Sequence, residues 1–273
     1  MLVGAVHSAG QARESVRIIG EGAEATVRLD DSRGVVTKAY KPRDGGGNRR
    51  DAALREYRIL VRFERALRVV PGVTCPAPLA LDQDLPGVSM RYVDGARLHD
   101  YVARTRLTDA ELRRVALGLA KGLCTYLSVV HEPYYDFCLH NALFQPAESR
   151  VVLLDFGIPR WQPPLHGHYA DVELSVGNLL GCVLYELVRP ARVCSGLAQR
   201  QLVAVYCALR DQLLREGALR AADLRGVEEV ARFTYRRLTH PSPGPALRRA
   251  WYRAWPVLDA TRLARAKRVM FAR

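Results

Sequence analysis

The sequence lacks any apolar run that approaches the roughly 20 residues of a membrane-spanning helix. Its first residues, 1–15, have neither a basic start nor a long apolar stretch, so they make a poor signal peptide. Internal repeats and low-complexity segments are also absent from the sequence. We therefore expect a globular protein that works inside a cell.

Cysteine and histidine show no metal-binding spacing. No two cysteines form a CxxC pair, and their spacing indicates neither a zinc site nor a disulfide framework, so we expect reduced, mostly buried thiols. His166 and His168 form a pair without a third ligand nearby, which favours surface histidines over a metal site. The six cysteines are Cys75, Cys124, Cys138, Cys182, Cys194 and Cys207.

Lysine is rare although the chain is strongly basic. The 273 residues carry 41 basic and 28 acidic side chains, a net charge of +13, yet only four of the basic residues are lysines. Two interpretations stay open: an arginine-rich solvated surface, or an anionic partner such as a nucleotide, lipid headgroup, phosphorylated sugar or nucleic acid. The C-terminal arginines lie among Trp251, Tyr252 and Trp255, which would suit RNA stacking. Apolar residues at helical spacing there favour a packed terminal helix instead.

The first third of the chain predicts strands and one helix. Residues 16–30 predict two strands around a glycine turn, 34–41 a third, and 87–95 a strand that ends in a turn, because β-branched and aromatic residues favour a pleated sheet. Apolar positions at helical spacing predict a helix over 49–68. Three prolines predict that this helix ends in a loop: Pro71, Pro76 and Pro78.

The remaining two thirds predict mainly helices, with the change near Asp94–Gly95. Thr108 and Glu111 have the spacing of a capping box, which predicts the start of a helix over 107–131. Residues 171–188 and 199–215 predict further helices, with more helix towards the C-terminus.

Phosphoryl transfer needs a cover over the phosphates, a cation that holds them, oxygen ligands for magnesium and a carboxylate at the attacking hydroxyl. The turn GEGAEATV, 20–27, lets the backbone approach a ligand closely, but any tight hairpin could use such a motif. Lys38 lies mid-strand among apolar residues, where a lysine is costly unless paired, and Glu56 is the natural partner. A strand-edge Lys38 that reaches solvent, or Lys41 as the phosphate-binding cation, are the alternatives.

Two polar motifs supply oxygen ligands. Asp136 and Asn141 stand five residues apart in YYDFCLHNALF, and Asp155 follows an apolar run in VVLLDFG. A carboxylate at the end of a buried strand, followed by glycine, suits a magnesium ion. Each motif alone is common, whereas the two at this separation are much rarer.

In this order the motifs resemble the protein-kinase-like superfamily over nearly the whole chain. GEGAEATV resembles its glycine-rich loop, VVTKAY its third-strand lysine, LREYRIL its helix-C glutamate, MRYVDG its hinge, DFCLHN its catalytic loop and LLDFG its magnesium loop. ADVELSVGNLLGCVLYEL resembles the helix that anchors the catalytic loop, with Asp171 as its buried aspartate. The resemblance implies a bilobal α+β fold. A small N-lobe, 1–93, would hold an antiparallel sheet and one helix, and a larger C-lobe, 94–273, would be mostly helical.

The resemblance also implies a role for each matching residue. Lys38 would hold the α- and β-phosphates and pair with Glu56, Asp136 would take the proton of the acceptor hydroxyl, and Asn141 and Asp155 would hold Mg²⁺. Lys38, Asp136, Asn141 and Asp155 are thus the candidate catalytic residues. The candidate nucleotide-binding residues are Gly20, Gly22, Ala23, Glu24, Ala25, Val27, Lys38, Glu56, Met90, Tyr92 and Val93.

The chain departs from the family pattern in several places. Ala25 takes the place of the third glycine, and Arg91 stands where a glutamate is frequent. Tyr134 and Tyr135 replace a histidine and its neighbour before the catalytic aspartate, and a tyrosine can provide the same packing and hydrogen bond. His140 is interpreted as a loop-stabilising donor.

The segment after Asp155 bears on the substrate, because Asp171 follows only sixteen positions after Asp155 and no APE triplet occurs. Such a short segment resembles the atypical branches of the superfamily. GAEA followed by a K-x-Y-K-P run resembles the kinase subunit of the tRNA-threonylcarbamoylation complex, and a catalytic loop that contains a cysteine and a histidine resembles the lipopolysaccharide core-sugar kinases. We expect an ATP- and Mg²⁺-dependent kinase that phosphorylates a hydroxyl, leaning to a lipopolysaccharide-core sugar or another small non-protein substrate. An atypical serine/threonine kinase acting in a complex is the first alternative, and a pseudokinase scaffold the second.

The expected partners follow from the same resemblance and from the charge. They are ATP and an anionic, hydroxyl-bearing acceptor, with saccharide or glycolipid favoured over protein. We do not expect nucleic acid. The expected location is the cytoplasm, with peripheral contact at the inner face of the membrane as the finer hypothesis.

Overall fold

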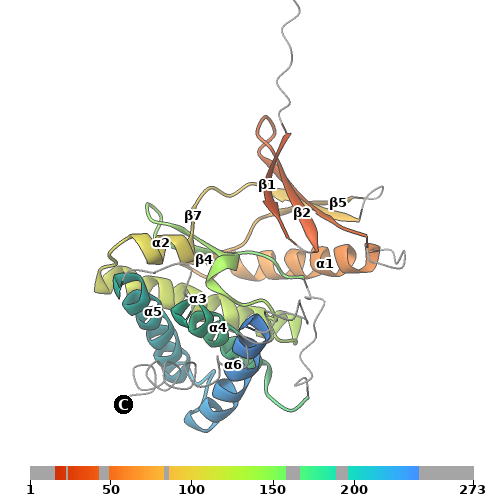
Figure 1. The fold of residues 1–273 in the computed structure, drawn as a ribbon. Coiled ribbons are helices and arrows are strands. Elements are labelled where there is room, and N and C mark those ends of the chain that lie inside the picture. The colour runs from red at the N-terminus through yellow and green to blue at the C-terminus, as the bar shows by residue number, and fades with distance from the viewer. Residues whose placement is uncertain are drawn as a thin grey trace, which may run out of the picture. The chain divides into compact units, whose positions relative to one another are not determined.

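The structure is a computed structural model, which describes residues 16–22, 24–42, 49–82, 86–157, 167–188 and 196–239 (Figure 1). The chain divides into two compact units, Met1–Tyr57 with Pro78–Tyr92, and Arg58–Ala77 with Val93–Arg273. We call them the sheet unit and the helical unit. The division falls within helix α1 (Arg50–Leu67), whose first half belongs to the sheet unit. The lobe boundary after residue 93 stays a prediction.

The sheet unit contains a five-stranded antiparallel sheet with the order β1-β2-β3-β6-β5. Alternate residues of β3, among them Lys38 and Tyr40, are buried on one face, as the period of two in a strand requires. The first half of α1 lies against this face and contributes the buried Glu56 (Figure 1). The strands are β1 (Val16–Glu21), β2 (Ala25–Asp30), β3 (Val35–Tyr40), β5 (Pro78–Asp82) and β6 (Gly87–Arg91).

Strand β5 corrects the predicted loop at Pro78, because that proline is the first residue of the strand. β5 lies at the edge of the sheet, where a residue without an N–H group removes no ladder hydrogen bond from a central strand. Pro71 and Pro76 lie outside strands, as predicted.

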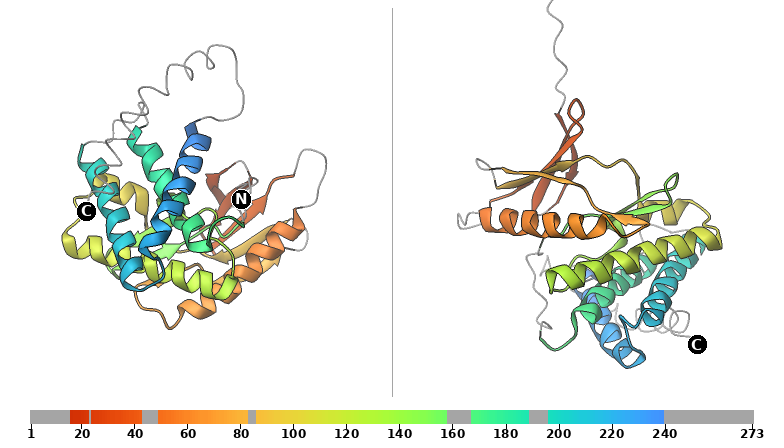
Figure 2. Two further views of the ribbon diagram at one scale, coloured as in Figure 1. Left: turned by 90° about the horizontal axis from the view of Figure 1, so that it is seen from below. Right: turned by 180° about the vertical axis from the view of Figure 1, so that it is seen from behind.

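The helical unit combines helices with a smaller four-stranded sheet of order β4-β9-β8-β7. Helix α4 packs along α6, while α5 packs against α3 and α2 (Figure 2). The helices are α2 (Leu98–Arg104), α3 (Asp109–Val130), α4 (Asp171–Val188), α5 (Gly196–Arg215) and α6 (Leu224–Thr239). The strands are β4 (Val73–Thr74), β7 (Ala96–Arg97), β8 (Ala142–Gln145) and β9 (Arg150–Leu153).

Helix α3 positions the strand that leads to Asp155. The helix begins with the predicted capping box, in which the Glu111 N–H donates to Thr108 Oγ1 at 3.2 Å and the Thr108 N–H donates to the Glu111 carboxylate at 2.8 Å. A Cβ atom added at Gly122 would lie 2.5 Å from the Leu153 side chain. A glycine is therefore needed for α3 to pack this closely on β9.

The predicted α+β class is confirmed: an antiparallel sheet with one helix comes first, and a mostly helical part follows. This arrangement is consistent with a bilobal kinase-like fold. Among the described residues, no helix is long and apolar enough to cross a bilayer. Ala23, His166 and the segment with Trp251, Tyr252 and Trp255 lie outside the described residues.

Candidate functional site

Lys38 and Glu56 form a buried ion pair in the sheet unit. The Lys38 Nζ atom donates to Glu56 Oε1 at 3.0 Å, and the two side chains are 10% and 2% exposed. The hydroxyl of Tyr40 donates to the other carboxylate oxygen of Glu56. Lys38 lies 5.3 Å from the centre of the Tyr40 ring. The sequence predicted the partner of Lys38 but not the contribution of Tyr40.

Lys41, the alternative cation, has a different environment. Its Nζ atom donates to Glu21 Oε1 at 2.9 Å, with side chains that are 34% and 64% exposed. Water and salt screen such a pair strongly. Of the two lysines, Lys38 is therefore the one that the interior of the unit holds in a fixed position.

The glycine turn between β1 and β2 is tight. The Gly22 N–H donates to the Ala25 carbonyl at 2.9 Å, and Gly20 stands opposite Val27 in the sheet. A Cβ atom added at Gly20 or Gly22 would make only ordinary contacts, at 3.5 Å to Val27 and 3.7 Å to Ala25. Packing within the unit therefore does not require glycine at these positions, whereas the close approach of a ligand would.

Arg49 is a second cation beside this turn, and the sequence interpretation missed it. Its side chain is 2% exposed and donates from Nη2 to the Glu24 carboxylate. The guanidinium lies 5.1 Å from the centre of the Tyr40 ring. The Nε and Nη1 atoms have no hydrogen-bond partner within the described residues. Arg49 lies within the glycine-rich stretch 44–51, so nothing in the sequence indicated that its side chain would be buried.

The predicted hinge residues differ in how their backbone is used. Met90 lies in β6 opposite Val36, and the Tyr92 N–H donates to the Gly34 carbonyl at 2.8 Å. The Tyr92 N–H group is therefore engaged within the sheet unit.

Asp136 and Asn141 come together in the helical unit. The Asn141 Nδ2 atom donates to Asp136 Oδ2 at 2.7 Å and to the Asp136 carbonyl at 3.1 Å. The Leu154 N–H donates to the Asn141 carbonyl at 2.9 Å, so the residue before Asp155 is tied to the same loop. We call Asp136, Asn141 and Asp155 the loop cluster.

Asp155 adopts the left-handed backbone conformation, with φ at 59°. Few residues other than glycine do so, although aspartate tolerates it better than most, and such torsions concentrate at functional sites. Its carboxylate accepts a hydrogen bond from the Gly157 N–H at 3.4 Å. The carboxylate of Asp155 and the amide oxygen of Asn141 are the hard oxygen donors that Mg²⁺ prefers.

Tyr134 supports the loop cluster from behind. Its ring lies 5.3 Å from that of Phe156, and its hydroxyl donates to the Leu154 carbonyl. Burial, and next the charge of Asp155, raise the pKa of Tyr134 well above its ordinary value, so the phenol keeps its proton and remains a donor. The packing and the hydrogen bond that we expected from Tyr134 are both present.

Helix α4 anchors the loop, but not through the residue that the resemblance implied. The Tyr134 N–H donates to Ser175 Oγ at 2.9 Å, and the Asn178 Nδ2 atom donates to the Phe137 carbonyl at 3.4 Å. Asp171 is half-buried in the first turn of α4, which corrects its assignment as a buried aspartate. Small polar residues three apart in an apolar helix were the signal that could have identified Ser175 and Asn178.

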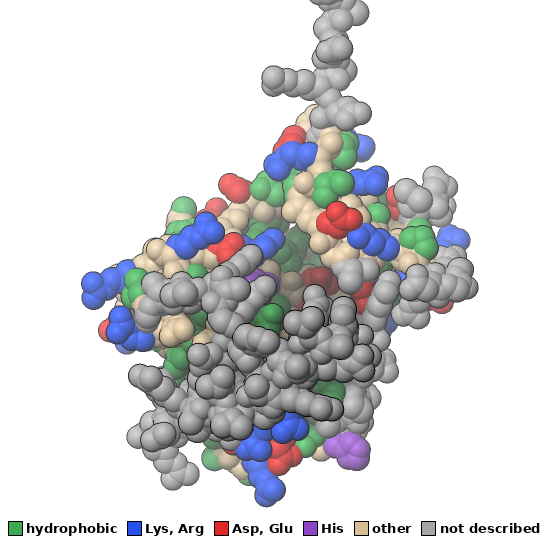
Figure 3. Space-filling model, in the orientation of Figure 1, with side chains coloured by type: hydrophobic (Ala, Val, Ile, Leu, Met, Phe, Trp, Pro, Cys, Tyr) green, Lys and Arg blue, Asp and Glu red, His purple; other side chains and the backbone are tan. Residues whose placement is uncertain are grey.

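A cavity of roughly 240 Å³ adjoins the loop cluster and is lined by both Asp136 and Arg237 of α6. Burial lowers the pKa of Arg237 to about 10, while the charges of Cys182 and Asp136 act in the opposite direction. The guanidinium therefore stays protonated at neutral pH and adds a positive charge near the Asp136 carboxylate. On the face shown in Figure 3, the visible Lys and Arg side chains are dispersed among acidic and other groups.

No family model matches the chain, and no curated protein matches it in sequence. Among solved structures, a crystal structure of Rad53 in complex with AMP-PNP is similar, with a TM-score of 0.42 and 20% sequence identity. The similarity covers 80% of this chain and 57% of the Rad53 chain in that structure, so this chain spans little more than half of the chain it matches.

Proposed function

We propose that the chain is a kinase-like phosphotransferase that uses ATP and Mg²⁺ and phosphorylates a hydroxyl group. The observation that carries the proposal is the loop cluster, in which Asn141 binds Asp136 at 2.7 Å and is tied to the residue before Asp155. The buried Lys38–Glu56 pair supplies the cation for the phosphates. The N-lobe would comprise residues 1–93 and the C-lobe residues 94–273.

The donor atoms fit the ligands that this reaction needs. The Asn141 amide nitrogen donates to Asp136, and the amide oxygen of Asn141 and the carboxylate of Asp155 would be the ligands of Mg²⁺. When bound, the ion neutralises negative charge on the phosphates. The glycine turn would cover the phosphates through its N–H groups, and the segment from Met90 to Val93 would meet the adenine.

The chemical step assigns one task to each polar residue. Asp136 accepts the proton of the acceptor hydroxyl while that oxygen forms a bond to the γ-phosphorus. The bond from the γ-phosphorus to its bridging oxygen breaks, and ADP leaves with the electron pair. Asn141 holds the Asp136 carboxylate in orientation, and Lys38 stabilises the charge on the phosphates.

An anionic saccharide or glycolipid is the acceptor that we favour. The net charge of +13 and the position of Arg237 near Asp136 both suit a negatively charged molecule. The short connection between Asp155 and Asp171 suits a small acceptor. The protein would act in the cytoplasm, at the inner face of the membrane, and a protein acceptor is the alternative.

The test is transfer of ³²P from γ-labelled ATP in the presence of Mg²⁺, with a membrane-glycolipid fraction and a generic protein offered in parallel. Asp136→Asn and Asp155→Asn should each lower the rate by about 10²–10³-fold, as expected for the loss of a group that stabilises the transition state. Asp211→Asn is the matched control, because Asp211 is exposed and pairs with its neighbour Arg210.

Label in glycolipid supports the favoured acceptor, and label in protein alone establishes the alternative. Absence of transfer, of ADP release and of nucleotide binding would overturn the proposal and leave a scaffold.

A further inference from the structure

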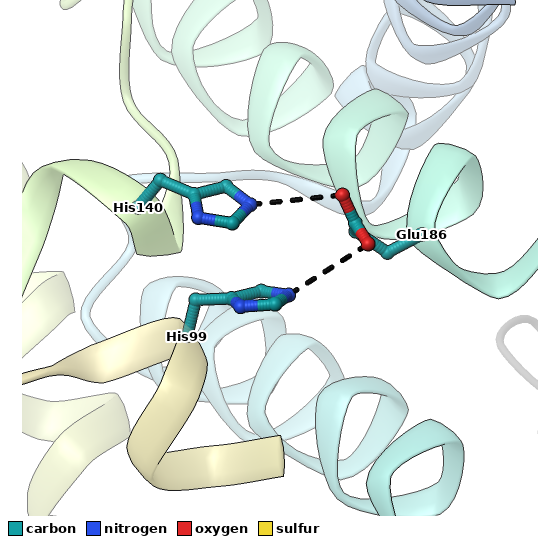
Figure 4. A group of neighbouring side chains, drawn as sticks. All are labelled: His99, His140 and Glu186. Atoms are coloured by element: carbon teal, nitrogen blue, oxygen red, sulfur yellow. Dashed lines mark ion pairs between the residues drawn. The ribbon is translucent and has the colours of Figure 1, made fainter. Parts of the chain in front are cut away.

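Two histidines and a glutamate converge on the side of the catalytic loop that faces α2 and α4. His99 comes from α2, His140 from the short 3₁₀ helix Leu139–Asn141, and Glu186 from α4 (Figure 4). One ligand atom from each lies within 4.8 Å of the other two. The imidazole rings are stacked, with centres 3.9 Å apart and an interplanar angle of 27°. Sequence spacing gave no hint of the cluster, because its members are 41 and 46 residues apart.

The distances within the cluster are too long for hydrogen bonds. The His99 Nε2 atom lies 3.9 Å from Glu186 Oε2, and the His140 Nε2 atom lies 3.7 Å from Glu186 Oε1. A charged hydrogen bond of this kind closes to about 2.7–2.9 Å. His99 Nε2 is buried and has no hydrogen-bond partner among the described residues. Buried polar atoms nearly always have a hydrogen-bond partner or a metal ion beside them, so we expect His99 Nε2 to bind one.

The protonation of His99 explains why Glu186 is not that partner. The His99 Nδ1 atom lies 3.2 Å from the Asp100 carboxylate, which only accepts hydrogen bonds, so the proton of the neutral ring resides on Nδ1. The lone pair of Nε2 then faces the lone pairs of Glu186 Oε2. Two acceptors that face each other repel unless a cation, or a donor such as water, lies between them. In metal sites, a metal-bound histidine usually donates its other ring N–H to a carboxylate, which orients the ring, and Asp100 has this position beside His99.

We propose that His99, His140 and Glu186 bind a divalent transition-metal ion, with Zn²⁺ as the preferred metal. Two histidines and a glutamate with one open position form an established zinc ligand set. Zinc bonds of 2.0–2.2 Å place tetrahedral ligands about 3.3 Å apart, so each nitrogen–oxygen distance must shorten by roughly 0.5 Å. The stacked imidazole rings must also turn away from each other, so that both Nε2 lone pairs point at one ion. The cavity of roughly 240 Å³ that these three residues line has room for a water molecule as the fourth ligand.

The site differs in chemistry and role from the Mg²⁺ ligands proposed above. Imidazole favours zinc-like ions, whereas magnesium prefers oxygen atoms alone. His140 precedes Asn141 directly, so the metal would connect the catalytic loop to α2 and α4 and hold it in place. This positioning role rests on the proposed function, but metal binding itself does not.

The test uses the full chain, free of any purification tag and dialysed against EDTA. Titration with Co²⁺, followed by its visible absorption, and with Zn²⁺ against a chromophoric chelator should give one ion per chain. Zn²⁺ should raise the unfolding temperature, because a ligand that binds only the folded state stabilises it. Glu186→Gln, which keeps the shape of the side chain, and His140→Ala should weaken binding by more than about 100-fold. Asp100→Asn, which alters only the supporting carboxylate, should weaken it by about 10–100-fold.

Three controls separate this site from other metal ligands. His131→Asn keeps a side chain that tolerates the left-handed backbone at that position, where φ is 57°. His168→Asn alters the pair formed in the sequence by His166 and His168. Both variants should bind Zn²⁺ with the parent's affinity. Asp155→Asn should also bind Zn²⁺ normally, since it alters only the proposed Mg²⁺ site. Circular dichroism of each metal-free variant reports whether it folds.

The proposal is overturned if the parent chain takes up no Co²⁺ or Zn²⁺, or if folded Glu186→Gln binds one ion with the parent's affinity. Metal binding that persists in a chain without kinase activity would refute the proposed function and leave this site standing.

Discussion

The two lysines of the sheet unit form ion pairs of nearly equal length in opposite surroundings. Lys38 lies 3.0 Å from Glu56 with both side chains buried, whereas Lys41, three residues on, lies 2.9 Å from Glu21 at the surface. Distance alone would rank the pairs as equal. Burial separates them, because a charge without its partner can be rehydrated at the surface but not in the interior. The buried pair therefore fixes a cation in position, and the exposed pair does not.

The largest effect on stability should come from Lys38→Met. The substitution leaves the Glu56 carboxylate buried without its cation, which costs about 3–5 kcal/mol. Urea denaturation of the variant beside the parent chain measures the loss of free energy of unfolding. A loss below about 1 kcal/mol would show that Glu56 is not held as the structure describes.

The second effect should be a recovery of stability. In the double variant Lys38→Met/Glu56→Leu, apolar side chains replace the whole pair, and such exchanges are neutral or stabilising by about 1–4 kcal/mol. The double variant should therefore regain the parent's denaturation midpoint or exceed it. A double variant that stays as unstable as Lys38→Met would mean that the pair stabilises the fold by its attraction.

A smaller effect is expected for Tyr40→Phe. This change removes the hydroxyl that donates to the second carboxylate oxygen of Glu56 and leaves the ring in place. An unsatisfied buried acceptor costs about 1–3 kcal/mol. The same denaturation series ranks this loss against that of Lys38→Met, and an equal loss in the two variants would contradict the expected ranking.

The smallest effect is expected for Lys41→Met. The hydrogen bond from Lys41, and next its charge, lower the pKa of Glu21, so the pair contributes above the ordinary carboxylate pKa and its contribution is lost as the pH falls through the lowered value. Because water and salt screen this surface pair, we expect no measurable change in the urea midpoint. An NMR titration should show the Glu21 pKa returning to its ordinary value in the variant. An unchanged Glu21 pKa would contradict the assigned ion pair with Lys41.

The sequence predicted the helices whose apolar residues recur at helical spacing over many residues. The helices over 107–131 and 171–188 are present as α3 and α4 because their apolar spacing repeats over several turns. Helix α2 was missed because its seven residues are too short for such a repeat, and β5 because a proline opens it.

Within the site, sequence reasoning found residues that carry their own chemical requirement. A lysine among apolar residues requires a carboxylate, which led to Glu56. No comparable requirement is visible in the sequence for Tyr40, Ser175 or the cluster around Glu186. Their partners are distant in the sequence, and only the fold brings them close.

The central claim is that the buried Lys38, not the exposed Lys41, acts on the phosphates. The most direct measurement is Mg²⁺-dependent ADP release from ATP by the parent chain, by folded Lys38→Met/Glu56→Leu and by Lys41→Met. We predict a rate lower by about 10²–10³-fold in the double variant, because a charge-stabilising group is lost, and the parent's rate in Lys41→Met. Equal rates in the two variants, or a loss only in Lys41→Met, would contradict the claim.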